Sequence, residues 1–147
     1  MSKKPPTIIY KGRTIGIVIL TVAQLIIGVI HCFFGLLLLA FENLSFLPTT
    51  ALYDLYTFIF GLLALVFAVF IWQGKKVGWI GTVAVSLFVI VADSLTVLDL
   101  PSIPGIPKFP AIAEIAYSLL IVFYLLQDNI REKYLVPAKN ENWKKIN

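Results

Sequence analysis

Four long blocks of apolar residues, separated by short polar links, run through the chain. Asp93 in the third block and Glu114 in the fourth are the charged residues that lie away from block ends. A helix needs about 20 mostly apolar residues to cross the hydrocarbon core of a bilayer. The pattern therefore predicts membrane-spanning helices over residues 14–41, 54–74, 77–99 and 109–128.

Small and polar residues recur within each block at alternating steps of three and four. Lipid tails are as apolar as Leu, so membrane helices associate through small residues and hydrogen bonds. Each stripe should face the other helices. The four stripes predict an all-α transmembrane four-helix bundle, with sequential antiparallel neighbours. They are Thr21, Gln24, Gly28, His31 and Gly35; Asp54, Thr57, Gly61, Ala64 and Ala68; Thr82, Ser86, Val89, Asp93 and Thr96; and Glu114, Tyr117, Ile121, Tyr124 and Asp128.

The composition agrees with a membrane protein. Hydrophobic residues make up 59% of the 147 residues and charged residues 14%, and the mean hydropathy is +0.91. A soluble domain has about 45–50% apolar and about 25% charged residues. We expect one membrane domain over residues 1–147 and no soluble catalytic module. The first apolar block is too long for a signal peptide, so we expect it to remain as a span.

Basic residues indicate the orientation. The N-terminal arm, the link between spans two and three and the C-terminal tail hold 11 of the 12 Lys and Arg residues, and Lys108 is the twelfth. Cytoplasmic segments carry excess Lys and Arg. We therefore expect a multi-pass protein of the plasma membrane with both termini cytoplasmic. The inner basic residues should contact anionic lipid headgroups; they are Lys11, Arg13, Lys75, Lys76 and Arg131.

Aromatic residues and the tail complete this picture. Tyr53 and Tyr56 fit an outer aromatic belt, and two tryptophans beside the second link fit an inner one. We expect the last helix to leave the membrane and to end near Pro137. The polar tail, residues 129–147, should be cytoplasmic and lie at the interface or contact a partner.

Three titratable residues are predicted to share one level of the membrane. At a rise of about 1.5 Å per residue, His31, Asp93 and Glu114 lie about 5, 6 and 8 Å to the outer side of the midplane. Tyr117 lies one turn deeper than Glu114. Ionisable groups in a membrane are costly and generally have a partner or a function.

Two interpretations of this polar cluster stay open. It is either a hydrogen-bonded network that fixes the order of the helices, or a site that binds a proton or cation from outside. In the second case the carboxyl groups are protonated when the site is empty and ionised around a bound cation. His31 would hydrogen-bond to Asp93 in that site.

The link between spans three and four contains a proline at every third position. Polyproline II has three residues per turn, so four such rings would line one edge of an extended segment about 28 Å long. This link is either a stiff connector or a ridge on which an extracytoplasmic partner docks. The prolines are Pro101, Pro104, Pro107 and Pro110.

Recognisable catalytic and cofactor patterns are absent from the sequence. It contains no CxxC pair, no glycine-rich phosphate loop and no GxSxG or HExxH motif. We expect no metal, no cofactor and no catalytic activity of the chain alone. No basic cluster accompanies a nucleic-acid-binding fold, so no nucleic acid is expected as a partner.

Three segments carry a resemblance to known proteins: the glycine-containing first span after a basic arm, residues 73–79 (QGKKVGW) and residues 124–134 (YLLQDNIREKY). Over about residues 12–135 the chain resembles a broad, largely uncharacterised group of small four-span membrane proteins of archaea and bacteria. The resemblance implies the four-span fold and no particular activity. The proline-rich link departs from the simplest members.

Two functions follow as expectations. The first is a non-catalytic accessory subunit that packs by helix–helix contacts in a larger membrane complex, such as a respiratory or monooxygenase assembly. The alternative is a small proton- or cation-linked transporter or channel that uses the outer acidic cluster. The expected partners are membrane lipids and other membrane protein subunits, and a homo-oligomer is a further alternative.

Overall fold

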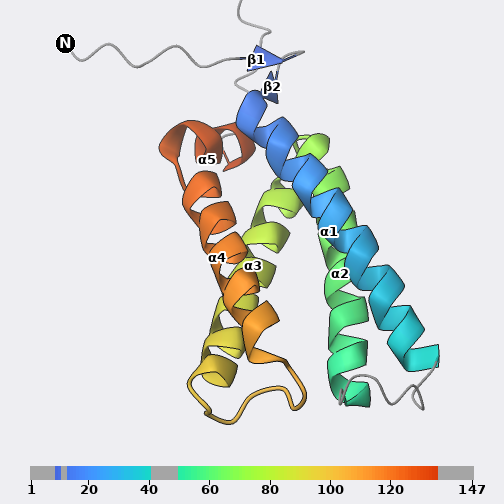
Figure 1. Cartoon of the computed structure of the whole chain (residues 1–147). Helices are drawn as coiled ribbons and strands as arrows, with labels where there is room; N and C mark the ends of the chain where they lie inside the picture. The colour runs from blue at the N-terminus through green and yellow to red at the C-terminus, as the bar shows by residue number, and fades with distance from the viewer. Residues whose placement is uncertain (1–8, 11–12, 41–49, 136–147) are drawn as a thin grey trace, which may run out of the picture.

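Four long helices form the body of the protein, which is a computed structural model that describes residues 9–10, 13–40 and 50–135 (Figure 1). The helices are α1 (Ile15–Ala40), α2 (Ala51–Trp72), α3 (Lys76–Val97) and α4 (Lys108–Leu125). Each is long and apolar enough to cross a membrane. The predicted all-helical bundle with four candidate spans is therefore confirmed.

Neighbours in sequence are neighbours in space. α1 packs along α2, α2 along α3 and α3 along α4, and the chain runs up and down through the bundle (Figure 1). A two-residue antiparallel ladder precedes α1 and joins β1 (Ile9–Tyr10) to β2 (Arg13–Thr14). This arrangement matches the antiparallel order expected from the short links.

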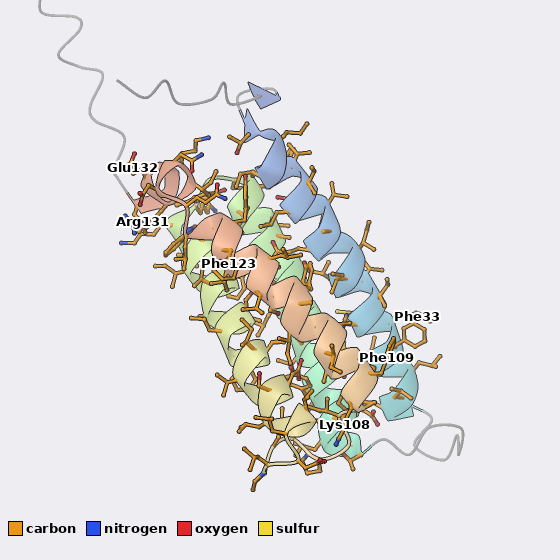
Figure 2. The ribbon with its side chains drawn as sticks, turned by 60° about the vertical axis from the view of Figure 1, so that its left-hand side comes forward. Phe33, Lys108, Phe109, Phe123, Arg131 and Glu132 are labelled. Carbon is orange, nitrogen blue, oxygen red and sulfur yellow. The ribbon has the colours of Figure 1, made fainter. Side chains whose placement is uncertain are left out.

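The outward surface is apolar between two charged ends. Figure 2 shows Phe33 on α1 and Phe109 and Phe123 on α4 pointing away from the bundle. Lys108 lies at one end of the same view, and Arg131 and Glu132 lie at the other. This distribution suits a bundle whose middle contacts lipid tails and whose ends reach water.

The predicted inward stripes are mostly buried. All five stripe residues of α2 are buried, as are Thr21, Gln24, Gly28 and Gly35 on α1. The stripe of α4 was placed partly wrong. The buried residues of α4 are Ala111, Ser118, Ile121, Val122 and Leu125, and of these Ile121 belongs to the predicted stripe.

Glycines bring α1 and α2 into backbone contact. A Cβ atom added to Gly61 would lie 2.6 Å from the backbone nitrogen of Cys32, and one on Gly35 would lie 2.7 Å from the nitrogen of Phe58. Real Cβ atoms do not approach other atoms so closely, so these positions need glycine. Small residues at such contacts are the usual way in which membrane helices pack.

The link between α2 and α3, residues 73–75, is a tight helix-ending turn, and we call it the inner link after the orientation expected from the sequence. Gly74 adopts a φ of 73°, the left-handed conformation that glycine adopts without strain. The Gly74 N–H donates to Ile71 O and the Lys75 N–H donates to Phe70 O, each at 2.9 Å. This is the Schellman pattern, and it places Lys75 and Lys76 at the end of the bundle that also carries β1 and β2 (Figure 1).

The end of the chain differs from the expectation. α4 ends at Leu125 instead of continuing towards Pro137, and a separate helix, α5 (Asp128–Leu135), follows. Ile130 and Tyr134 of α5 are buried, because they complete an apolar cluster at this end of the bundle. The rest of the predicted tail, residues 136–147, lies outside the described residues.

This apolar cluster seals one end of the bundle, and we call it the inner plug. Two hydrogen bonds hold it: Trp79 Nε1 donates to Leu125 O at 2.9 Å, and the Tyr134 hydroxyl donates to Ile71 O at 3.1 Å. α5 thus covers the plug from the outside of the bundle (Figure 1). Its buried residues are Ile17, Leu20, Ile71, Ile121, Leu125, Ile130 and Tyr134.

Candidate functional site

His31 and Glu114 meet across the bundle, as the sequence predicted for members of one cluster. His31 Nε2 lies 3.3 Å from Glu114 Oε1, and both side chains are about one-fifth exposed. The other ring nitrogen, Nδ1, lies 2.9 Å from Ile27 O, one turn back on α1. A carbonyl oxygen only accepts, so Nδ1 carries a proton.

This geometry limits the charge states of the pair. Because Nδ1 is protonated, Nε2 either carries a second proton and faces a carboxylate, or accepts a hydrogen bond from a neutral Glu114 acid. Both states have the same total charge, zero. The edge of His31 also contacts the Phe60 ring, whose centroid is 4.9 Å away, so the imidazole is held from a third helix.

Asp93 lies beside this pair but is not bonded to His31. We expected His31 to hydrogen-bond to Asp93, and that expectation is wrong, because the imidazole points to Glu114 on α4. Asp93 is fully buried, with 0% exposed. Neither of its carboxylate oxygens has a hydrogen-bond partner among the described residues. Its carboxyl group still interacts electrostatically with that of Glu114, so the two acidic groups are neighbours.

Tyr53 and Tyr56 of α2 belong to the same region, which the sequence analysis did not foresee. We had assigned both to an outer aromatic belt. Their hydroxyl groups also interact electrostatically with Asp93 and Glu114, and the aromatic belt stays a prediction. The Tyr56 hydroxyl is buried and makes no hydrogen bond to the described residues. The spacing of Asp54 and Thr57 on the inward stripe places Tyr53 beside it, and this was the signal available in the sequence.

Tyr117 lies deeper than the acidic groups, as predicted, but serves a different part of the bundle. Its hydroxyl is buried without a hydrogen bond to the described residues. It lines a small cavity of about 10 Å³ together with Gln24, Thr82 and Ser86. Gln24 Nε2 donates to Thr82 Oγ1 at 3.3 Å. A cavity of about 10–15 Å³ is the size that holds one water molecule.

The polar residues thus form a column that ends at the inner plug. His31, Asp93 and Glu114 lie towards its outer end, and the cavity around Gln24 and Tyr117 lies below them. Beyond that cavity, the inner plug fills the bundle with apolar side chains. All four spanning helices contribute to this column.

The link between α3 and α4, residues 98–107, is called the outer link here. It does not form one extended proline ridge. A turn at Pro104 and Gly105, with a Gly105 φ of 92°, breaks the left-handed polyproline conformation, whose φ is about −75°. Pro107 caps α4, and Pro110 lies within its first turn, where proline fits because those N–H groups have no helical partner. Pro101 precedes the turn, so the four rings do not share an edge.

Instead, the link is bonded to the outer end of the bundle. Ser102 Oγ donates to Ala92 O at 2.7 Å, and Thr50 Oγ1 donates to Pro104 O at 2.5 Å. Lys108 pairs with Asp99 at 2.7 Å on the surface. The link therefore covers the end nearest to Asp93 and joins α3 to the start of α2. Partner docking at this link stays a prediction.

The predicted lipid-contacting basic residues that the structure describes lie at the opposite end. Lys75 and Lys76 are exposed at the inner link, and Arg131 is exposed on α5, where it pairs with Asp128 at 2.8 Å. Lys11 and the side chain of Arg13 lie outside the described residues. An exposed ion pair of this kind contributes little to stability. Contact of Arg131 with anionic lipid headgroups therefore stays a prediction.

An apolar groove of about 490 Å³ runs between α2 and α3. Leu55 and Ile59 of α2, Phe88 of α3 and Ile103 of the outer link line it. Leu55, Ile59 and Phe88 are exposed, so in a bilayer this surface is met by acyl chains. Tyr56 also lines the groove, which places the groove beside the acidic groups.

No protein family, curated protein or solved structure matches this chain. Within residues 9–10, 13–40 and 50–135, no three His, Cys, Asp or Glu side chains lie together in a way that could hold a metal ion. The candidate site is therefore defined by its own geometry: a His31–Glu114 pair beside a buried, unpartnered Asp93.

Proposed function

We propose that this chain is a non-catalytic accessory subunit of a larger membrane complex, in which it packs through helix–helix contacts. The observation that carries the proposal is the inner plug. Its apolar side chains are buried, and Trp79 and Tyr134 bond across it to Leu125 and Ile71. A bundle locked at one end suits a rigid packing element better than a conducting path.

We also propose its orientation. Both termini lie on the cytoplasmic side of the plasma membrane, because 11 of the 12 basic residues belong to the arm, the inner link and the tail. β1, β2, the inner link and α5 share one end of the bundle, and the outer link lies at the other (Figure 1), which supports a single assignment of sides.

Surfaces for packing are present on the two outer helices. α4 packs mainly on α3, and α1 mainly on α2, so each has a broad side free of the other helices. On α4 this side carries Phe109 and Leu120, which are 85% and 72% exposed. Such side chains can face lipid or a second membrane protein.

The test is extraction of the native complex in a mild detergent, followed by native electrophoresis and mass spectrometry. We expect the chain in a large complex at fixed stoichiometry, and a Leu120→Trp variant on α4 should weaken that association. Gln127→Trp, at an exposed position between α4 and α5 and outside both packing surfaces, serves as a control for the added bulk. Recovery of the chain alone or as a small homo-oligomer would contradict the subunit proposal.

A second candidate is a small proton- or cation-linked transporter or channel. The unpartnered Asp93 carboxyl group in the polar column favours it, because such a group is a natural ion-binding element in a membrane protein. Transport would require the inner plug to open. Proton and cation flux into vesicles that contain the purified protein tests this candidate. Flux that Asp93→Asn abolishes would support transport, and absence of flux would remove it.

A further inference from the structure

Asp93 is a buried acid for which the described residues provide no hydrogen-bond donor. It is 0% exposed, and both carboxylate oxygens are without a hydrogen-bond partner among the described residues. A buried carboxylate is stable only where donors or cations compensate its charge. An ionised Asp93 would therefore need a bound ligand that compensates its negative charge.

The surrounding groups offer Asp93 no positive charge. His31 of α1 is engaged by Glu114 and by Ile27 O. Glu114 of α4 is itself acidic: it repels an ionised Asp93, and it lies near enough for a side-chain hydrogen bond once one of the two carboxyl groups is protonated. From α2, Tyr53 and Tyr56 face this region with uncharged hydroxyl groups.

The remaining nearby group does not change this balance. Tyr117 of α4 lies deeper, and its hydroxyl has no hydrogen-bond partner in the described part of the chain. His31 and Glu114 together carry zero net charge in either of their protonation states. Ionised Asp93 would therefore leave one uncompensated negative charge in the membrane interior.

We propose that Asp93 is a proton-binding site, occupied in the resting protein as a neutral carboxylic acid beside the His31–Glu114 pair. Binding of one proton changes the cluster from a net charge of −1 to zero and forms one O–H bond on Asp93. The site is independent of the subunit or transport proposals, because a subunit can also hold a proton at this position.

The outer link and the partly exposed His31–Glu114 pair define the side from which the proton arrives. Glu114 and His31 are about one-fifth exposed, whereas Asp93 has no exposed surface. The inner plug separates the cluster from the other end of the bundle. A proton therefore reaches Asp93 from the outer end, past Glu114.

Infrared spectroscopy of the purified full-length protein in lipid nanodiscs tests this assignment. A protonated carboxyl group has a C=O stretching band separate from that of carboxylates, and the band shifts when H₂O is exchanged for D₂O. At neutral pH we expect this band in the wild type, and its loss in Asp93→Asn. Glu114→Gln should keep the band at a shifted position, because Asp93 retains its proton.

Two matched variants serve as controls. Asp54→Asn removes the other buried aspartate, which lies in the first turn of α2 and has one carboxylate oxygen without a hydrogen-bond partner among the described residues. Glu132→Gln removes an exposed carboxyl group on α5 (Figure 2). Both should leave the band unchanged, and its loss in Asp54→Asn would overturn the assignment to Asp93.

Isotope labelling keeps the test independent of folding of the Asp93 variant. Carboxyl-¹³C aspartate should shift the band in the wild type, whereas ¹³C glutamate should leave it in place and shift only the separate band that a neutral Glu114 would add. The proposal is overturned by absence of the band in the wild type at neutral pH, by its persistence in Asp93→Asn, or by its disappearance when Na⁺ or K⁺ is added at constant pH. The last result would identify a cation as the ligand. None of these outcomes depends on whether the chain copurifies with partners.

Discussion

At the scale of single residues, buried polar atoms that have a hydrogen-bond partner differ in role from those that have none. Tyr134 and Trp79 place their polar atoms on backbone carbonyls at the ends of α2 and α4, where the regular intrahelical hydrogen-bond pattern stops. These are anchoring contacts. The hydroxyl of Tyr117 and the carboxyl group of Asp93 have no such partner within the described residues. The anchors lie at the inner end and the unpartnered groups lie above them.

Removing one anchor should loosen the inner plug. Tyr134→Phe deletes the hydroxyl that donates to Ile71 O, and we expect a loss of about 1 kcal/mol in the free energy of unfolding. Tyr117→Phe is the matched control, because its hydroxyl makes no hydrogen bond to the described residues; its stability should stay equal or increase. Denaturant titration in detergent measures both. Equal destabilisation of the two variants would contradict the anchoring role.

At the scale of helices, glycine determines how closely α1 and α2 approach. Gly28 and Gly61 face each other, and the Gly61 carbonyl would lie 3.0 Å from a Cβ atom on Gly28. This approach brings His31, one turn further along α1, to its position beside Phe60 of α2. Close packing of this helix pair therefore positions one member of the candidate site.

Adding one methyl group at this contact should be unfavourable. Gly61→Ala places a Cβ atom 2.6 Å from the Cys32 nitrogen, and because backbone must then move, we expect a loss of about 1–3 kcal/mol. Ala116→Val on the exposed side of α4 is the control and should change little. Thermal unfolding in detergent compares them. A Gly61→Ala protein as stable as the wild type would show that the two helices can separate freely.

At the scale of the whole molecule, the two ends of the bundle differ in chemistry. One end carries the basic inner link and α5 over the inner plug, and the other carries the outer link over the acidic groups (Figure 1). An asymmetric charge distribution of this kind orients a protein during insertion. Asp93 and the inner plug therefore lie towards opposite ends of the bundle.

Cysteine labelling in intact cells tests the orientation. In a Cys32→Ala background, Leu100→Cys in the outer link should react with a membrane-impermeant maleimide. Gln127→Cys between α4 and α5 should react only after the membrane is permeabilised. Both positions are exposed in the structure, so the difference reports the side of the membrane. The reverse pattern would contradict cytoplasmic termini.

Several features of the fold could be read from single residues. The long charge-free runs over residues 14–41 and 55–74 predicted α1 and α2, and the small residues Gly61, Ala64 and Ala68 predicted the buried side of α2. Such predictions succeed because hydrocarbon admits only closed hydrogen-bonded helices, and because small residues gather where helices meet. The break after Leu125 was not predicted, since no Gly or Pro marks it and the first proline that follows is Pro137.

What the sequence by itself determined is the set of four apolar helices, their antiparallel order and the level of the acidic groups, because length and composition control these features. Only the tertiary structure decided the partners of those groups. His31 bonds to Glu114 and not to Asp93, since helix rotation and close approach select which side chains meet. The rotation of α4 about its axis also places Ser118 and Leu125 on its buried side. Side-chain partners depend on shifts of a few ångströms between helices, which spacing along one helix does not encode.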